Sequence, residues 1–530
     1  MPDMSQTFQL LPWKGGVNTS LDPALIEPGQ LVQGDNIVFG FQYSKRQREG
    51  IKHNWDDATS TTNSVIGLKD FWYGAAAGKT QKAVAVHDSK AVYTHTVSSG
   101  ARSADLFAGT AWGSTITQCS METLNNLMII AVDGASNVMK KYSGSGNIAD
   151  LGGTPPVASI CREHLGRLWT NDKTNVDRLH YSTTANPEEW TGAGDSGAID
   201  IGVGDGDPEG ITAIFPTFKG DLFVAKKTKL YRLSGYSPEE WQVELVSNGV
   251  GCVSHNAITT ADQDDIYFLS EKGVHSLKAT QAYGDFEGAF VSLDIQKTFN
   301  DKFTKSRLKF ADMEYLSAIN SIALAITDES IASSQNRAIW LYNIPQKSWY
   351  RWPDISCASI AVLTDSDFRK RLFLGTNTGR VSKAFNAVNY DISAAGVNTA
   401  IVYTIKTGIM FPDNSPNTVK GIKRFGLIYR PEGSHTIVAT VKVDNYSNQN
   451  LVYTQSSSAA LLGTTFILGT SVLGLTYSML PYSLTIDGYG RGVQVTISSS
   501  TVDSLVDLQG LMIEWEPAGS PQEIILSESA

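Results

Sequence analysis

The chain has 530 residues and a formal net charge of −10 at pH 7, from 43 Lys and Arg against 53 Asp and Glu. Its hydrophobic content of 42 % and charged content of 18 % exclude a mainly disordered chain, and its length allows two or three domains. The acidic balance disfavours a protein that recognises nucleic-acid sequence, because that task normally needs a basic surface.

Residues 1–60 are predicted to form an extended leader that ends in a first hairpin. The N-terminus lacks a basic stretch followed by an apolar one, so we expect no secretory signal. The longest aliphatic run, Leu127 to Val132, is too short to cross a bilayer, and we expect no stable membrane insertion. The cysteines, without any CxxC spacing, are predicted to be buried free thiols in a reducing compartment: Cys119, Cys161, Cys252 and Cys357.

Residues 61–390 contain repeated pairs of short β-branched or aromatic runs separated by turn residues, a pattern typical of β-hairpins. The hairpins are expected at residues 82–96, 127–142, 166–182, 220–233, 265–277, 321–352 and 371–385. Their equivalent positions are Val84, Met128, Leu168, Phe223, Tyr267, Leu324 and Phe373, which lie 40–57 residues apart. Each unit therefore has room for a four-stranded blade, and the pattern predicts an all-β fold with a β-propeller of about seven blades, between six and eight. Two stacked sandwiches are the alternative.

Residues 391–530 have a different texture, with strict apolar–polar alternation in 401–443 and 493–516. Such alternation predicts half-buried antiparallel strands and hence an appended C-terminal β-sandwich. Residues 445–486 carry no charge. They are expected to form either a long hairpin whose tip meets a partner or a lipid surface, or ordinary strands with a polar loop.

An acidic, glycine-rich stretch runs from Asp195 to Glu209. Asp205, Asp207 and Glu209 alternate with small residues and offer oxygen ligands for Ca²⁺, but the full EF-hand pattern is missing. A loop between blades is the simpler interpretation, and we predict no metal site.

Motifs that mark catalysis are missing from the sequence. There is no HExxH, no G-x-S-x-G, and the eight histidines are scattered. Neighbouring carboxylates such as Glu188 and Glu189 point to opposite faces of a strand and cannot flank one bond. We therefore expect no enzyme activity, no catalytic residues and no cofactor.

Basic residues cluster at three hairpin ends, where solvated turns are expected. These clusters are Lys45, Arg46 and Arg48; Lys226, Lys227 and Lys229; and Arg369, Lys370 and Arg371. Tryptophans offer either packing between blades or stacking on sugar rings. They are Trp169, Trp190, Trp241, Trp340, Trp349 and Trp352.

Three stretches carry a family resemblance. The opening has residues 15–19 (GGVNT), Pro28-Gly29, Asp35-Asn36 and residues 45–50 (KRQREG); the others are residues 179–235 and residues 251–277. In these stretches the sequence resembles the β-propeller tail proteins of short-tailed bacteriophages, the hub, nozzle or packaged-DNA stabilisation group. Glu49 departs from the proline that is common at its position. The resemblance covers residues 10–300 in pattern and does not extend to the C-terminal sandwich.

The resemblance implies a structural subunit of the virion tail, assembled in the cytoplasm of the host bacterium. Such subunits form a ring, commonly a hexamer, below the portal and adaptor proteins. The ring continues the channel that retains and releases the genome, and its outside carries fibres or spikes. The implied partners are further copies of the chain, portal and adaptor proteins, fibre or spike proteins, and genomic DNA that passes non-specifically through the lumen.

Acidic residues in the lumen would repel the phosphates and keep the duplex mobile. The candidates for such a lining are Asp195, Asp200, Asp205 and Asp207. The alternative function is a carbohydrate-binding or carbohydrate-cleaving β-propeller that acts on a cell surface.

Overall fold

The computed structural model describes residues 5–40, 43–53, 63–75, 78–107, 112–191, 195–206, 210–261, 265–278, 290–329, 335–432, 435–444, 448–455, 480–503 and 505–518. The chain divides into two compact units. The propeller unit consists of residues 52–341 and 353–384, and the sandwich unit consists of residues 1–51, 342–352 and 385–530.

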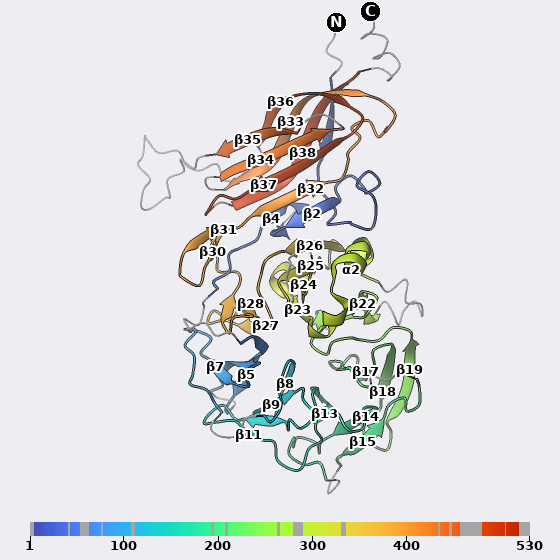
Figure 1. Ribbon diagram of the computed structural model, residues 1–530, viewed down its shortest axis with the longest axis vertical. Helices are drawn as coiled ribbons and strands as arrows, with labels where there is room; N and C mark the ends of the chain where they lie inside the picture. The colour runs from blue at the N-terminus through green and yellow to red at the C-terminus, as the bar shows by residue number, and fades with distance from the viewer. Residues whose placement is uncertain are drawn as a thin grey trace, which may run out of the picture. The chain divides into compact units, whose positions relative to one another are not determined.

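Seven antiparallel sheets, described here as blades 1 to 7, follow one another around a ring in the described part of the propeller unit (Figure 1). Blades 1 to 3 contain β5 (Val65–Tyr73), β6 (Thr80–His87) and β7 (Val92–His95); β8 (Cys119–Leu124), β9 (Leu127–Val132), β10 (Lys140–Tyr142) and β11 (Ala149–Asp150); β12 (Cys161–His164), β13 (Arg167–Asn171), β14 (Arg178–Tyr181) and β15 (Gly197–Asp200). Blades 4 and 5 contain β16 (Ala213–Ile214), β17 (Leu222–Ala225), β18 (Lys229–Ser234) and β19 (Gln242–Asn248); β20 (Ile258–Ala261), β21 (Asp265–Leu269) and β22 (Val274–Ser276). Blades 6 and 7 contain β23 (Asp312–Leu316), β24 (Ser321–Ile326) and β25 (Ala338–Asn343); β27 (Ser359–Thr364), β28 (Lys370–Gly375) and β29 (Val381–Lys383).

The seven positions predicted to be equivalent all lie in the second strand of their blades, so the propeller with about seven blades is confirmed. These second strands are buried on both faces, as in β24, where all six residues are buried. A strand that is covered on both sides needs a continuous apolar run, not an alternating one. Short turns set the hairpin register: Asn125 and Asn126, both with positive φ, join β8 to β9.

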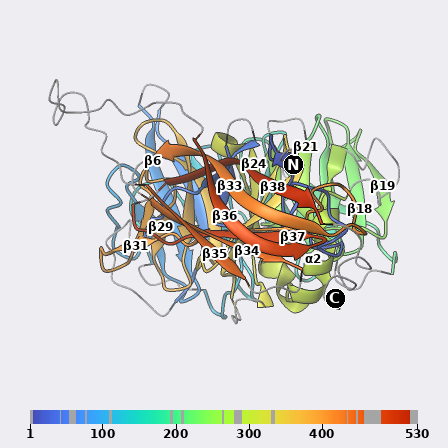
Figure 2. The ribbon, with the colours of Figure 1, turned by 90° about the horizontal axis from the view of Figure 1, so that it is seen from above.

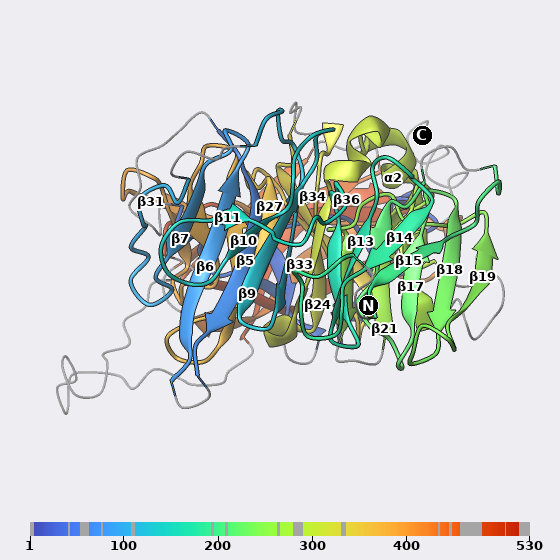
Figure 3. The same ribbon diagram turned by 90° about the horizontal axis from the view of Figure 1, so that it is seen from below.

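Apolar contacts between neighbouring blades hold the ring together, and Figure 3 shows β5 and β6 of blade 1 beside β9 of blade 2. The ring closes where Leu68 of blade 1 packs in one cluster with Leu363 and Phe373 of blade 7. The chain just before blade 1 adds a further fastening, because Lys52 exchanges two backbone hydrogen bonds with Lys383 at the outer edge of blade 7 (2.8 and 3.0 Å). Short helices precede and follow β23: η3 (Leu293–Ile295), α2 (Gln296–Lys302), η4 (Lys305–Phe310) and η5 (Ser317–Ile319).

The sandwich unit has two main sheets, whose long strands are seen in Figure 2. Its strands are β1 (Gln6–Leu10), β2 (Leu31–Asp35), β3 (Ile37–Phe39), β4 (Lys45–Gln47), β26 (Ser348–Trp352), β30 (Tyr390–Ile392), β31 (Asn398–Ala400), β32 (Tyr403–Thr407), β33 (Lys420–Glu432), β34 (His435–Val443), β35 (Gln449–Gln455), β36 (Leu480–Gly490), β37 (Val493–Ser499) and β38 (Leu505–Pro517). One sheet has the order β3-β4-β38-β33-β36, with β1 also paired to β38. The strands of the other sheet have the order β26-β2-β32-β37-β34-β35. Buried and half-buried residues alternate strictly along β37, as the sequence predicts for a sandwich.

The boundaries of the units differ from the predicted ranges 1–60, 61–390 and 391–530. The first 51 residues do not form a separate leader: β1 and β4 pair with β38, and β2 pairs with β32. Residues 342–352 also belong to the sandwich unit, and its C-terminal part begins at Phe385. Of the uncharged segment 445–486, residues 445–447 and 456–479 lie outside the described residues.

Residues of the N-terminal opening act as fasteners inside the sandwich unit. Arg48 binds both carboxylate oxygens of Asp391 (2.8 and 2.7 Å), and its Nε donates to Asn36 Oδ1. Gly16 and Gly50 leave no room for a side chain, since a Cβ on Gly50 would lie 1.8 Å from the carbonyl oxygen of Tyr390.

The sequence predicts that all three basic clusters lie in solvated turns, but two of them contain a buried lysine. Lys45 is fully buried, with its Nζ donating to the carbonyl oxygen of Trp13 (2.9 Å). Lys226 is also fully buried and pairs with Asp177 and Asp205. For these two lysines a buried carbonyl oxygen or carboxylate therefore takes the place of water around the ammonium group.

Candidate functional site

The innermost strands of the blades bring charged side chains into the centre of the propeller. Lys69 of β5 binds Glu122 of β8 (3.0 Å), and Arg162 of β12 approaches the other oxygen of Glu122 (3.4 Å). Burial would raise the pKa of Glu122, but the two cations together lower it. This network borders an inner cavity of about 220 Å³, which Lys69, Arg162, His255 and Glu314 help to line. These ion pairs link the innermost strands of blades 1, 2 and 3 beside the inner cavity.

Two carboxyl groups of β23, Asp312 and Glu314, differ from Glu122 because neither forms an ion pair with a described cation. Burial raises the pKa of Asp312 to about 7, although its carboxylate accepts the backbone N–H of Ile360 (2.9 Å). Burial and the nearby Asp312 raise the pKa of Glu314 to about 8, against the opposing effect of Lys69 and Arg162. Both groups therefore exchange protons near neutral pH.

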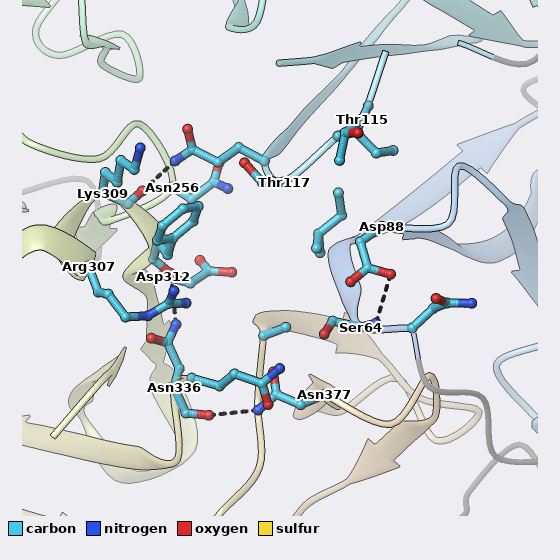
Figure 4. Close-up of a pocket in the computed structure, with 17 residues that line it drawn as sticks. Ser64, Asp88, Thr115, Thr117, Asn256, Arg307, Lys309, Asp312, Asn336 and Asn377 are labelled. Atoms are coloured by element: carbon cyan, nitrogen blue, oxygen red, sulfur yellow. Dashed lines mark hydrogen bonds between the residues drawn. The ribbon is translucent and has the colours of Figure 1, made fainter. Parts of the chain in front are cut away.

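A larger cavity, about 480 Å³, opens at the end of the propeller where the innermost strands begin (Figure 4). We call it the propeller mouth. Its lining comes from blades 1, 2, 5, 6 and 7: Asn63, Ser64, Ile66, Asp88, Thr115, Ile116, Thr117, Gln118, Asn256, Arg307, Lys309, Phe310, Asp312, Gln335, Asn336, Ala358 and Asn377. Antiparallel pairing brings these segments together, since loops that precede first strands lie at the same end as turns between second and third strands. Amide and hydroxyl groups dominate this lining.

Several contacts give the propeller mouth a fixed shape. Asn336 donates to the carbonyl oxygen of Phe310 (2.7 Å), and Asn377 donates to the carbonyl oxygen of Asn336 (3.0 Å). Gln118 of blade 2 donates to the carbonyl oxygen of Lys309, and Asp88 accepts the backbone N–H of Ser64 (3.0 Å). The bonds of Gln118 and Asn377 join different blades, so the position of these lining groups depends on their neighbours.

Two cations and one aromatic ring form one wall of the propeller mouth. The Arg307 guanidinium lies 4.5 Å and the Lys309 ammonium 5.0 Å from the centre of the Phe310 ring. Asp88 lies on the other side of the cavity in Figure 4. Sequence reasoning missed this wall, because its residues lie in a short 3₁₀ helix between blades and belong to no recognisable motif.

The predicted acidic lining residues lie elsewhere. Asp200 lies in β15, the outer strand of blade 3, and binds Arg178. Asp195 lies just before this strand and binds Arg167. The hydrogen bond from Arg167 lowers the pKa of Asp195 to about 2. Asp205 follows in the loop between blades 3 and 4, whereas Asp207 lies outside the described residues.

A cation accompanies each described member of this acidic set. Asp205 pairs with Lys226 (3.0 Å) and Lys229 (3.5 Å), and it accepts the hydroxyl of Tyr231. Its oxygens are engaged by protein donors, in contrast to the open oxygens that Ca²⁺ requires. In the described part of the chain, no group of three or more His, Cys, Asp and Glu is placed to hold a metal ion.

The tryptophans weighed as sugar platforms mostly lie in the interior. Trp169, Trp340, Trp349 and Trp352 are at most 3 % exposed. Trp169 packs against Trp241 with ring centres 4.9 Å apart.

The four cysteines are buried and free, in agreement with the sequence prediction. Among the described residues, no helix is long and apolar enough to cross a membrane.

Comparison with known proteins yields similarity of structure alone. No protein-family model and no curated protein matches the sequence. Similar solved structures include BBS1N in complex with ARL6DN (11 % identity, TM-score 0.39, 63 % of this chain and 97 % of that chain) and YCF48 bound to D1 peptide (10 %, 0.38, 64 % and 96 %). The RRP9 WD40 repeats are also similar (10 %, 0.36, 64 % and 99 %). With TM-scores of 0.36 to 0.39 these likenesses carry no argument about function, and the chain is described by its fold: a β-propeller with an appended β-sandwich.

Proposed function

We propose that the protein is a structural subunit of a short-tailed bacteriophage tail. In this role several copies, six in the commonest arrangement, close a ring below the portal and adaptor. The ring retains and releases the genome and carries fibres or spikes. Assembly takes place in the cytoplasm of the host bacterium, and the protein then resides in the virion.

The observation that carries the proposal is the N-terminal opening, where the resemblance to the tail proteins begins. Its distinctive residues have structural tasks in this chain: Gly16 and Gly50 permit close backbone approach, and Arg48 binds Asp391 at two oxygens. The close backbone contacts and the ion pair of this sandwich therefore require glycines at positions 16 and 50 and an arginine at position 48. The absence of catalytic motifs from the sequence also suits a scaffold.

The centre of the propeller adds a constraint on the proposed channel. The ion pairs of Glu122 join innermost strands of blades 1 to 3, and the two cavities described above, of about 220 and 480 Å³, are far too small for a DNA duplex. In the proposed ring, DNA would therefore pass between copies and not along the propeller axis. Because Asp195, Asp200 and Asp205 are each paired with a cation, repulsion of the phosphates would rest on the net charge of −10 more than on these three groups.

The proposal is tested by the mass and shape of the purified full-length protein, alone and mixed with portal and adaptor proteins. Light scattering and electron microscopy are expected to show a closed ring in at least the mixed sample. A protein that stays monomeric in both samples overturns the proposal. Retention of such a monomer on a glycan matrix, or hydrolysis of a glycan by it, would instead assign the carbohydrate function.

A further inference from the structure

The cationic wall of the propeller mouth has no acidic partner within the described chain. Arg307 is half-buried, and its guanidinium donates from Nε to the hydroxyl of Thr327 (3.1 Å). Burial lowers the pKa of Arg307, with no carboxylate near enough to oppose that effect. Lys309 is exposed and contacts only the Phe310 ring with its ammonium group. Arg307 and Lys309 thus place two positive charges on one wall of a chain whose formal net charge is −10.

A partly desolvated guanidinium gains most when an anion reaches it, because burial has already removed part of its hydration. The two carboxyl groups of the cavity do not supply that anion. Asp88 accepts the Ser64 N–H on the far side, and Asp312 accepts the Ile360 N–H. An incoming anion is therefore attracted to the Arg307 side of the cavity and repelled from the Asp88 side, so the charges of the cavity orient a bound acidic ligand.

We propose that the propeller mouth binds the carboxylate side chains of an acidic segment of a partner polypeptide, with Arg307 and Lys309 as the recognising cations. Amide side chains make up much of the remaining wall, and amides both donate to and accept from a peptide backbone. The recess of about 480 Å³ holds a few side chains. A DNA duplex presents its phosphates along a rigid rod that cannot enter such a recess, whereas a flexible acidic segment can. The inference rests on this cavity alone and goes beyond the proposed role in the tail.

The test is fluorescence anisotropy of a labelled oligoglutamate peptide with the full-length protein. The double variant R307Q/K309Q removes both cations, and the matched control K302Q removes one exposed cation at the end of α2, outside the cavity lining. We expect the double variant to bind at least about tenfold more weakly, since hydrogen bonds to charged groups are the stronger class. K302Q is expected to bind within about twofold of the wild type, because Lys302 lies outside the lining of the cavity. Melting temperatures of all variants verify that the fold is intact.

Competitors distinguish the sources of negative charge. We expect unlabelled oligoglutamate to displace the probe, while a neutral peptide of equal length, inorganic phosphate and duplex DNA do not at matched concentrations. Equal weakening by K302Q and by the double variant would show non-specific attraction and overturn the proposal. Displacement by phosphate or by DNA at least as effective as by oligoglutamate would also overturn it, and would assign the mouth to phosphate groups. Absence of oligoglutamate binding by the wild type at low salt would end it outright.

Discussion

Replacing Glu122 by Gln should destabilise the propeller, because it leaves two cations at the centre without their shared counter-ion. The side chains of Lys69, Glu122 and Arg162 are 31 %, 13 % and 19 % exposed. Breaking a buried pair costs about 3–5 kcal/mol and an exposed one about 0.2–1 kcal/mol. Since Lys69 keeps its bond to the carbonyl oxygen of Met121, we expect E122Q to lower the free energy of unfolding by about 2–3 kcal/mol.

Urea denaturation measures this loss, and Glu163 supplies a matched control. Glu163 lies in β12 and accepts the backbone N–H of Gly166 without binding a cation. A glutamine at this position keeps an accepting oxygen, so E163Q is expected to change the free energy of unfolding by less than about 1 kcal/mol. In the double variant K69M/E122Q one unpaired cation is removed, and part of the loss should be regained. Equal effects of E122Q and E163Q would refute the argument that the central ion pairs hold the blades.

Three further predictions concern stability. R48K should cost about 2–3 kcal/mol, because lysine cannot bind both oxygens of Asp391, and hydrogen exchange at the Ile51 amide, which donates to the same carboxylate, should accelerate; unchanged exchange would contradict this. Burial lowers the pKa of Lys45, so the unfolded chain binds more protons at this residue, and the free energy of unfolding rises with pH up to the unfolded pKa. In urea denaturation at increasing alkaline pH, the wild type should therefore gain stability relative to K45M. Parallel plots of the free energy of unfolding against pH for the two proteins would count against this. Asp312 and Glu314 have raised pKa values of about 7 and about 8, so the folded chain holds their protons longer and stability falls as pH rises from about 4 to about 8; D312N/E314Q should flatten that fall in urea titrations, and an unaltered slope would exclude these groups as its source.

The propeller could be predicted because its signal is local and repeated. Each second strand is a short apolar run beside a turn, and Val84, Met128 and Leu168 mark such strands without any long-range information. The number of blades follows from their spacing. The sandwich was predictable for the same reason, from the alternation in strands such as β37.

The assignment of the first 51 residues was not predictable in this way. β1 and β4 are short, and what decides their fold is pairing with β38, almost the whole chain length away. Burial of Lys45 is likewise decided by distant groups, because only the tertiary structure shows that the Trp13 carbonyl oxygen accepts a hydrogen bond from its ammonium group. The cationic wall depends on Arg307 and Lys309 lying side by side without an ion pair among the described residues, which no sequence spacing reveals.

The pairing of β1 with β38 also has a consequence for biosynthesis. Gln6 is opposite Trp515, so β1 receives its neighbour only after about 500 further residues have been synthesised. At about 5–20 residues per second, that delay is on the order of 25–100 s. During this interval the blades can close one after another, while the N-terminal strands wait with unsatisfied edges. Synthesis of β38 thus sets the time at which the sandwich can form, because a nascent chain that lacks β38 cannot pair β1 and β4.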